Sequence, residues 1–453
     1  MRSTITFCGG AGLVTGSNFL FDIGEAKFLI DCGLTQGTLE TEALNWEPFP
    51  YKPEDISFLI VTHAHIDHIG RIPKLVHDGF RGKILSTEPT KAIAEPLLFD
   101  ALELLFHSAK RQGKEPFYGK EDITKALQMW ETVPLHTKQA LRGGVSFEFF
   151  RSGHILGSSM ACFTRDGRSI VFTGDLGSGN SPLLPLVEDL PAVQYLVMES
   201  VYGDRVRHED GNSCQELENI IENTVRRGGT LLIPAFSTER TQDLLFDIRT
   251  LMLKKQIPSM PVYLDSPLAQ KITTAYLSYP SYFAPNIEKR IEKGENIFTF
   301  PELRWIEDME QSRALMQAPN PKIIIAGSGM SNGGRVISHE EHILPDPAST
   351  LLIVGYQAAG SLGRRLIDGA KKVEIMGRSV PVKCQIEHIY GYSAHMDGEA
   401  LLEFVNKGNA SLKEVFVVMG EPASSAFLAQ RIRDYLGVKA VTPERGEKVT
   451  IEV

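Results

Sequence analysis

Three histidines and an aspartate lie within six residues of one another, directly after an apolar run: His63, His65, Asp67 and His68. Imidazole nitrogens and carboxylate oxygens are ligands that suit Zn²⁺, with Mn²⁺ or Fe²⁺ as alternatives. His63 and His65 are two residues apart, so in an extended chain their side chains project to the same side and can bind one ion. Asp67 and His68 lie on the turn that follows and can face a second ion. The spacing therefore predicts a metal site rather than a polar loop with incidental histidines.

Three further residues of these types each follow an apolar run that is typical of a buried strand. They are His154 in SGHILGS, Asp175 in FTGDLG and Glu199 in MESVYGDR. Because an α/β sheet usually presents its site at the carboxyl ends of its strands, we expect these side chains to gather near the histidine cluster. The strands are short and separated by glycine turns, and one hairpin turns at Gly24 and leads to Asp31.

The pattern of elements changes twice along the chain. The first half combines short strands with a long amphipathic helix pattern around 89–112. From about residue 212, helices and strands alternate regularly, which predicts a parallel, doubly wound unit, and after 380 short strands return. We therefore expect an α/β protein in which one domain, residues 1–205 and 381–453, is interrupted by an inserted domain at 206–380.

The composition is that of an ordinary globular protein, with 42% hydrophobic and 23% charged residues. No uninterrupted apolar stretch reaches the ~18 residues that a membrane span requires, and the glycine-rich N-terminus argues against a signal peptide. The five cysteines are scattered, without a CxxC pair, which points to reduced thiols and a cytoplasmic protein. A net charge of −9 argues mildly against binding nucleic acid by charge alone, but it leaves room for a local positive groove.

The order of these motifs resembles that of the metallo-β-lactamase superfamily. Asp31 matches the structural aspartate that orients the histidine loop in that family, His154 matches its third histidine, and Asp175 matches the carboxylate that bridges two metals. The resemblance implies two zinc ions, with Mn²⁺ as an alternative. It divides the ligands between the ions as follows: His63, His65 and His154 for the first, Asp67 and His68 for the second, and Asp175 for both.

Two more motifs are similar to those of the β-CASP branch, the nucleases related to the mRNA 3′-end processing endonuclease, ribonuclease J and Artemis. Glu199 matches the acidic residue of the first motif, and His395 in GYSAHMD matches the histidine of the second. The inserted unit, with GSGMSNGGR and GYQAAGSLGRRL, resembles the β-CASP domain itself. The resemblance covers nearly the whole chain. It implies a metallo-β-lactamase αββα sandwich interrupted by a parallel α/β β-CASP domain.

One position departs from the pattern of the RNA-cleaving members. They place a histidine ligand of the second metal before a Gly-Glu pair, where this sequence has Met419 before Gly420 and Glu421. A thioether suits soft ions such as Cu(I) and is a poor ligand for Zn²⁺. We therefore expect a second site held by the remaining ligands and water, with weaker occupancy. Artemis-type members also lack this histidine, so the substitution does not imply inactivity.

The resemblance also implies a mechanism, in which a water activated by the metal ions hydrolyses a phosphodiester bond. Asp67 or Asp175 could orient that water. We expect His395 to bind the phosphate and act as general acid, with Glu199 holding it in the protonated form. The expected catalytic residues are thus Asp67, Glu199 and His395. Because this chemistry does not require the 2′-hydroxyl, DNA is an alternative substrate.

The leading interpretation is a metal-dependent endonuclease of single-stranded RNA, with exonuclease activity as in some relatives. Arg364 and Arg365 follow the GSLG loop and could contact the nucleic-acid backbone, although a solvated basic face explains them equally well. The alternative is an RNA-binding scaffold with an incomplete second metal site and little or no cleavage, which Met419 favours. Hydrolysis of a small ester or thioester is a third interpretation. A homodimer is compatible with the sequence.

Overall fold

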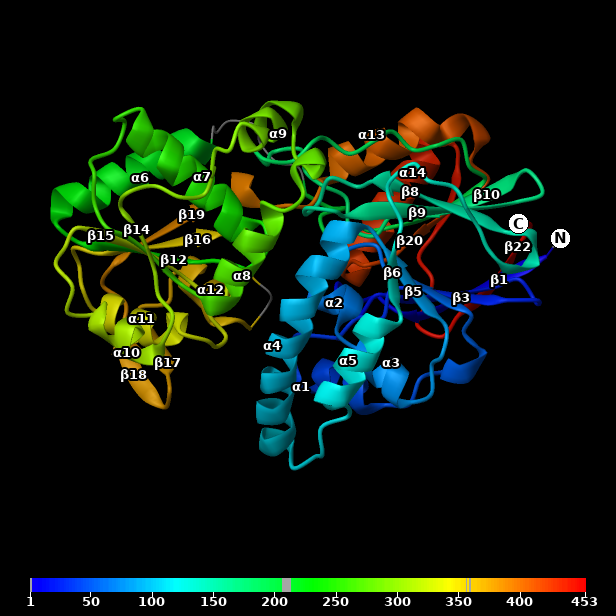
Figure 1. Ribbon diagram of the computed structural model, residues 1–453, viewed down its shortest axis with the longest axis horizontal. Coiled ribbons are helices and arrows are strands. Elements are labelled where there is room, and N and C mark those ends of the chain that lie inside the picture. The colour runs from blue at the N-terminus through cyan, green and yellow to red at the C-terminus, as the bar shows by residue number, and fades with distance from the viewer. Residues whose placement is uncertain (1, 206–212, 356, 358–359) are drawn as a thin grey trace. The chain divides into compact units, whose positions relative to one another are not determined.

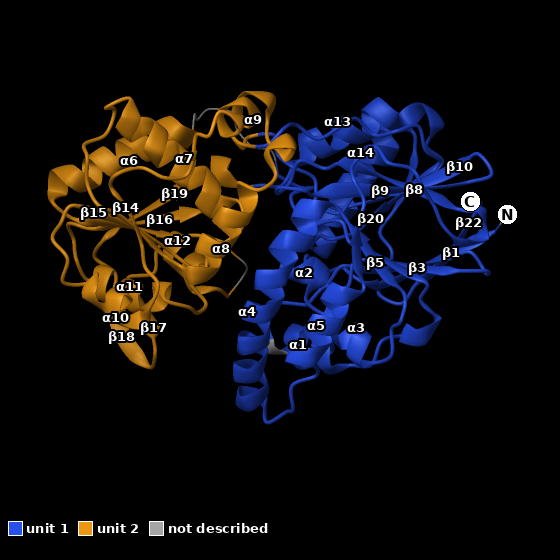
Figure 2. Cartoon of the chain, viewed as in Figure 1, with its two compact units in different colours: residues 1–179, 184–207, 394–453 blue, residues 180–183, 208–393 orange. Residues whose placement is uncertain are grey.

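The computed structural model describes residues 2–205, 213–355, 357 and 360–453 and divides into two compact units (Figure 2). Unit 1 comprises Met1–Gly179, Leu184–Arg207 and Ala394–Val453, and unit 2 comprises Asn180–Leu183 and His208–Ser393. The chain therefore leaves unit 1, builds unit 2 and returns to complete unit 1. Among the described helices, none is both long enough and apolar enough to cross a membrane.

Unit 1 contains two seven-stranded sheets (Figure 1). In spatial order, the first sheet consists of β22 (Lys448–Ile451), β1 (Ser3–Gly9), β2 (Asn18–Asp22), β3 (Lys27–Ile30), β4 (Phe58–Ile60), β5 (Lys83–Ser86) and β6 (Trp130–Thr132). The second consists of β21 (Lys439–Val441), β20 (Glu414–Val417), β11 (Tyr195–Met198), β10 (Arg168–Phe172), β9 (Ser159–Arg165), β8 (Ser146–Arg151) and β7 (Gln139–Ala140). Each sheet thus joins a strand from the C-terminal segment to strands from the first half of the chain.

Aromatic side chains fill the space between the two sheets of unit 1. The rings of Phe21 on β2 and Phe163 on β9 have centroids 5.5 Å apart, and the same distance separates Phe7 on β1 from Phe416 on β20. All four rings are buried in one apolar cluster. Burying a side chain of this size stabilises the fold by roughly 1.5–3 kcal/mol, so these contacts hold the sheets face to face.

Helices cover the outer faces of this sandwich (Figure 1). The first sheet is accompanied by α1 (Leu39–Ala43), α2 (Ile66–Ile69), α3 (Ile72–His77), α4 (Glu88–Gln112) and α5 (Lys120–Gln128). The second is covered by α13 (Gly398–Gly408) and α14 (Pro422–Leu436), whose Leu401 and Leu428 share a buried cluster with Leu196 of β11. The expected αββα sandwich is confirmed, and α4 confirms the helix predicted around 89–112.

Unit 2 is built on a six-stranded sheet in which every neighbouring pair of strands is parallel. Its strands, in spatial order, are β14 (Leu303–Trp305), β13 (Val262–Asp265), β15 (Lys322–Ala326), β12 (Thr230–Pro234), β16 (Thr350–Val354) and β19 (Gln385–Ile389). Fully buried runs such as TLLIV in β16 are typical of strands covered on both faces. A separate hairpin consists of β17 (Lys372–Ile375) and β18 (Arg378–Pro381).

The helices of unit 2 lie on both faces of its sheet, with α6 and α7 on one side and α10 and α11 on the other (Figure 1). They are α6 (Ser213–Arg227), α7 (Arg240–Leu253), α8 (Pro267–Tyr276), α9 (Pro285–Glu292), α10 (Met309–Ala314), α11 (Val336–Ile343) and α12 (Leu362–Ile367). The unit continues to Ser393, beyond the boundary at 380 that we placed from the sequence, because β19 adds to the sheet beside β16.

Candidate metal centre

The histidine cluster begins where β4 ends, in the first sheet of unit 1. Residues 61–65 continue from the strand without helical structure, and His65 then caps the N-terminus of α2, which carries Asp67 and His68. His63 and His68 are fully buried. A buried strand that leads directly into a short helix therefore places all four side chains near the end of β4.

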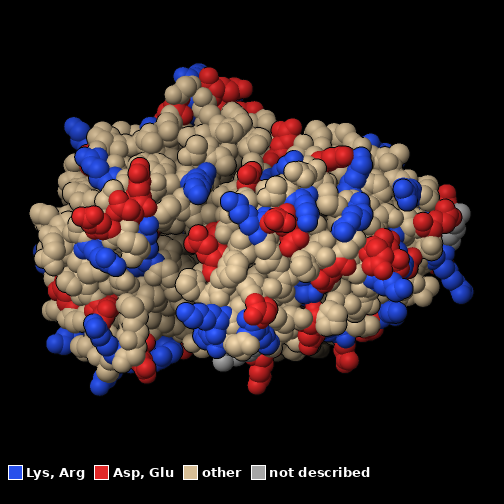
Figure 3. All heavy atoms as spheres, turned by 60° about the horizontal axis from the view of Figure 1, so that its bottom comes forward, with Lys and Arg blue, Asp and Glu red and all other residues tan. Residues whose placement is uncertain are grey.

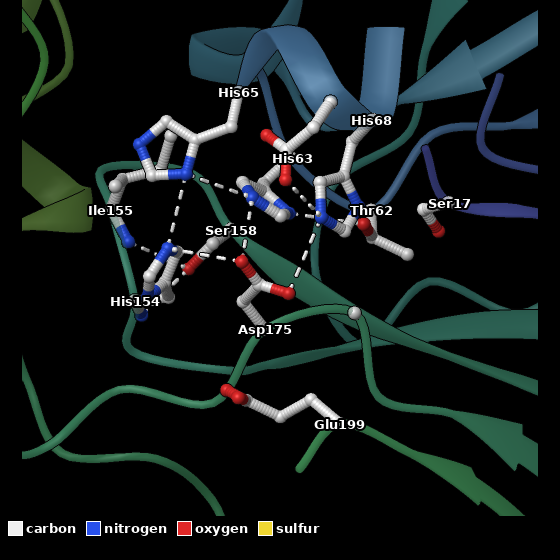
Figure 4. A network of polar contacts seen from close by, with 12 residues as sticks. Ser17, Thr62, His63, His65, His68, His154, Ile155, Ser158, Asp175 and Glu199 are labelled. Atoms are coloured by element: carbon white, nitrogen blue, oxygen red, sulfur yellow. Dashed lines mark hydrogen bonds and ion pairs between the residues drawn. The ribbon is translucent and has the colours of Figure 1, made fainter. Parts of the chain in front are cut away.

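Three histidines and an aspartate converge within this buried region (Figure 4). The Nδ1 atom of His65 lies 3.1 Å from the Nε2 atoms of both His63 and His154. One carboxylate oxygen of Asp175, Oδ2, lies 3.5 Å from Nε2 of His63 and 3.4 Å from Nε2 of His154. A tetrahedral Zn²⁺ with Zn–N bonds of about 2.0–2.1 Å spaces its ligand atoms about 3.4 Å apart. The spacing and the donor types therefore fit one ion.

The other oxygen of Asp175 faces a second group of candidate ligands. Its Oδ1 lies 3.3 Å from Nε2 of His68, and that nitrogen lies 3.8 Å from Oδ2 of Asp67. Within the described part of the chain, neither Nε2 of His68 nor Oδ1 of Asp175 has a hydrogen-bond partner, although both atoms are buried. A buried polar atom without a partner is costly, and an ion between these atoms would satisfy both.

Asp31 orients His68 through the ring nitrogen that faces away from Asp175. It follows β3 in a left-handed backbone conformation, with φ of 57°, and its Oδ2 lies 2.7 Å from Nδ1 of His68. Its Oδ1 accepts a hydrogen bond of 2.8 Å from the backbone N–H of Thr62. A carboxylate behind a histidine fixes the tautomer and leaves the opposite nitrogen free for a metal. Asp31 therefore turns Nε2 of His68 toward Asp175.

Burial and neighbouring charges set the protonation of these groups. Burial, aided by the other histidines, lowers the pKa values of His65 and His154 well below the usual range, which favours neutral imidazoles that can bind a metal. Burial opposes a charge on Asp175, but attraction by His68 and His63 outweighs it and holds the pKa of Asp175 well below its usual value. The carboxylate of Asp175 is therefore ionised at neutral pH.

A second carboxylate–histidine pair lies next to this cluster. Glu199, which follows β11, is buried, and both of its oxygens lie 3.2 Å from Nδ1 of His395. The same carboxylate accepts a 2.6 Å hydrogen bond from the backbone N–H of Leu176. Burial disfavours a charge on His395, but Glu199 outweighs it and raises the pKa of this histidine. The ring of His395 lies 4.6 Å from that of His154, measured between centroids, so the pair borders the metal cluster.

Backbone pairing brings His395 to this place from far along the sequence. His395 forms an isolated antiparallel bridge with Gly177, and the backbone N–H of Met396 donates to the carbonyl of Leu176. Gly177 lies directly after the loop that carries Asp175. Residues 176–178 therefore connect the metal cluster and the Glu199–His395 pair through their backbone.

Met419 lies just after β20, beside the strand that leads to Glu199. Its backbone N–H donates to Gly10 at 2.6 Å, and its carbonyl accepts from Ser200 at 3.3 Å. The side chain is buried in the apolar cluster between the two sheets. A Cβ atom on Gly10 would lie 2.4 Å from the sulfur of Met419, so the glycine leaves the space that the thioether fills. The sulfur thus packs as part of the core.

Two residues that the sequence interpretation did not include support the cluster (Figure 4). The hydroxyl of Thr62 lies within 3.1 Å of both Asp31 and Nδ1 of His63, and the hydroxyl of Ser158 accepts from the backbone N–H of His154 at 2.9 Å. Both residues stand next to a ligand or within four residues of it. In the sequence, the one feature that could have pointed to Thr62 and Ser158 is that each is a hydroxyl residue close to a histidine of the cluster.

The two candidate substrate-binding arginines belong to unit 2, on α12. Arg364 donates to both carboxylate oxygens of Asp368, at 3.1 and 3.0 Å, and is exposed, as is Arg365. Residues 356 and 358–359 of the GYQAAGSLG motif lie outside the described residues. On the face drawn in Figure 3, basic and acidic side chains are intermingled.

Three family models match successive parts of the chain. They are the Metallo-beta-lactamase superfamily over residues 11–200, the Beta-Casp domain over 241–366 and the Zn-dependent metallo-hydrolase RNA specificity domain over 379–443. The three together span most of the sequence in the order that the motifs follow.

Individual proteins are similar over nearly the full length. The chain is 36% identical to Ribonuclease TTHA0252 of Thermus thermophilus, over 88% of this chain and 89% of that protein. It is 31% identical to Transcription termination factor FttA of Methanosarcina mazei, over 96% and 69% of the two chains. A crystal structure of a protein of unknown function from Enterococcus faecalis V583 matches with a TM-score of 0.56 and 14% identity, over 100% of both chains, and supports the fold alone.

Proposed function

Because this chain belongs to the β-CASP branch of the metallo-β-lactamase superfamily, we propose that it is a metal-dependent ribonuclease that hydrolyses phosphodiester bonds of single-stranded RNA. Its membership confirms the resemblance that the motifs suggested. The observation that carries the proposal is the convergence of three histidines and Asp175 beside the buried Glu199–His395 pair. The match to an RNA specificity domain and the similarity to a named ribonuclease favour RNA over DNA.

The ligand sets follow from the two sides of Asp175. His63, His65 and His154 would bind one ion with Oδ2, and Asp67 and His68 would bind a second with Oδ1. When bound, two such cations lower the pKa of water and neutralise charge on the phosphoryl group undergoing transfer. Nitrogen and oxygen donors suit zinc, and Mn²⁺ would also fit. Because the sulfur of Met419 is packed in the core, the second set has one protein ligand fewer and would bind its ion more weakly.

The Glu199–His395 pair would supply the proton for the leaving group. Glu199 accepts from Nδ1 of His395 and raises the pKa of this histidine, so the ring is held protonated with its Nε2 directed away from the carboxylate. Nε2 would donate to the 3′-oxygen as the phosphodiester bond breaks, and Asp67 would orient the attacking water. The products would carry a 5′-phosphate and a 3′-hydroxyl.

Cleavage of a labelled single-stranded RNA, with metal content measured by elemental analysis, tests this proposal. The His63→Ala variant should lose metal and cleavage together, whereas His107→Ala, which changes an exposed histidine of the same unit, should lose neither. A circular RNA separates the two modes of attack, because only an endonuclease can cut a substrate without ends. A circular RNA left intact while the linear RNA is degraded would identify an exonuclease and contradict the interpretation as an endonuclease.

The packing of Met419 favours a second candidate, an RNA-binding scaffold with little or no cleavage. The variant Met419→His separates the two functions. If the protein is a nuclease, the unmodified chain cuts RNA and the variant gains occupancy of the second ion. If the unmodified chain holds one ion, does not cut, and gains both properties through Met419→His, the native protein is the scaffold.

A further inference from the structure

Unit 2 contains a cavity of about 340 Å³ whose wall includes the N-terminal ends of strands. Thr230 and Lys322 are the first residues of β12 and β15, Ser349 directly precedes β16, and all three line the cavity. Ligands of open α/β sheets usually bind at the opposite edge, outside the carboxyl ends of the strands. The volume is within the range of about 300–1,000 Å³ that is typical of small-molecule sites. This cavity is therefore large enough for a ligand and lies away from the carboxyl edge.

A buried cation faces this cavity without a matching anion. Lys322 is only 4% exposed, and its ammonium group donates to the carbonyl of Ala318 at 2.5 Å. Among the described residues, no carboxylate lies within 4.0 Å of this nitrogen, and burial lowers the pKa of Lys322. Removing an ammonium ion from water is costly unless an anion compensates for the lost hydration. A lysine has three N–H donors, so two remain for a ligand.

A second donor lies close to Lys322 in the sequence and on the same wall. Oδ1 of Asn320 accepts a hydrogen bond of 2.7 Å from the hydroxyl of Thr230, which fixes the orientation of the amide. Asn320 is exposed, and its Nδ2 donates no hydrogen bond to any described residue, so this N–H group is open to water or to an anion. The carboxylate of Asp346 also lines the cavity, where its oxygens accept hydrogen bonds from the hydroxyl of Ser349 at 2.5 Å and the backbone N–H of Ala348 at 3.1 Å.

The rest of the wall is largely apolar. Six of the lining residues have hydrocarbon or thioether side chains: Leu315, Met316, Ala318, Ile324, Ile343 and Pro345. An inorganic ion alone would leave this surface uncovered, whereas an apolar group attached to the anion would cover it.

We propose that this cavity binds a small molecule with an anionic head, a phosphate or a carboxylate, on a short apolar body. Lys322 and Asn320 bind the head, and the apolar lining residues cover the body. The site is independent of the proposed ribonuclease activity, because every residue that lines it belongs to unit 2. The competing explanation is purely structural, with Lys322 present only to cap the carbonyl of Ala318.

Calorimetric titration of the full chain, in a buffer free of phosphate, tests the site with phenyl phosphate as the probe. The native chain should show one saturable event that Lys322→Met weakens at least tenfold. The matched control is Lys371→Met, which removes an exposed lysine of the same unit and should bind like the native chain. Each variant keeps the metal centre, so any heat from phosphate binding there is common to all. Equal binding by Lys322→Met, or the absence of a Lys322-dependent event, would overturn the proposal.

A second variant keeps the test decisive if Lys322→Met does not fold. Asn320→Asp preserves the shape of the side chain and its acceptor for Thr230 but puts a negative charge where the anion would lie, so binding should again fall at least tenfold. Inorganic phosphate should bind more weakly than phenyl phosphate, and equal affinities would overturn the apolar body. Phenylacetate distinguishes the heads: tighter binding than phenyl phosphate identifies a carboxylate, and weaker binding identifies a phosphate.

Discussion

Replacing Glu340 by glutamine should make unit 2 more stable at neutral pH. Glu340 lies on α11, is fully buried and accepts a hydrogen bond from the hydroxyl of Ser331. Its other oxygen, Oε2, is buried without a hydrogen-bond partner among the described residues. Burial raises the pKa of Glu340 from 4.5 to about 8, so at pH 7 the folded chain holds a neutral carboxylic acid. Glutamine reproduces that neutral group.

The size of the effect follows from proton linkage. Between pH 4.5 and about 8, unfolded Glu340 is ionised while folded Glu340 retains its proton. The folded state thus binds more protons than the unfolded state, so the contribution of Glu340 to stability is greatest below pH 4.5 and falls by about 1.4 kcal/mol per pH unit as pH rises toward 8. From pH 5.0 to 7.5 the native chain should therefore lose about 3 kcal/mol that Glu340→Gln keeps.

Urea unfolding followed by fluorine NMR of 5-fluorotryptophan measures this difference in the correct unit. Trp305, on β14, reports on unit 2, whereas Trp46 and Trp130 belong to unit 1. Glu341→Gln serves as the control, because it removes a partly exposed carboxylate paired with Arg378 and should change stability by less than about 1 kcal/mol. The reasoning is refuted if Glu340→Gln and the native chain show the same pH dependence, since all other titrating groups are common to both.

Three further changes probe the metal centre. Asp31→Asn should weaken binding of the second ion by about 10- to 100-fold, because Nδ1 of His68 loses its carboxylate partner, and should leave binding of the first ion unchanged. Stepwise metal titration measures both affinities. Glu199→Gln should lower kcat on RNA by about 100-fold or more at unchanged metal content, because His395 loses the group that raises its pKa. A fall in bound metal would contradict the role of Glu199 as the partner of His395. Chelation of the metal should abolish cleavage of RNA. Activity should return with zinc or manganese but not with magnesium, because magnesium prefers sites made of oxygen ligands alone. Cleavage measured after dialysis against each ion tests this.

Local patterns in the sequence predicted much of unit 1. The hairpin that turns at Gly24 is present as β2 and β3, and α4 begins and ends within a residue of the predicted helix. These elements depend on alternation, helical periodicity and turn residues, all of which act over short stretches of chain. The resemblance to a known family then supplied the sandwich, which local patterns alone do not specify.

Other features depend on contacts between distant parts of the chain and could not be predicted from local pattern. The end of unit 2 at Ser393 depends on the pairing of β19 with β16. The sequence of a short strand does not indicate which other strand it will pair with. Lys322 and Glu340 are charged residue types that are usually exposed, so their burial becomes visible only when the sheet and α11 enclose them. For the same reason the cavity beside Lys322 has no signature in the sequence.

Asp175 faces both of the proposed ligand sets, and its position depends on the residue before it. Gly174 has a left-handed backbone with φ of 56°, and a Cβ atom there would lie 2.7 Å from Thr62, the residue that precedes His63. With Gly174 in this close approach, the carboxylate of Asp175 directs Oδ2 to the three-histidine group and Oδ1 to His68. An ion in the first group would therefore fix the oxygen offered to the second. The loss of a ligand at Met419 should weaken the second ion most when the first site is empty, so the two ions should bind cooperatively.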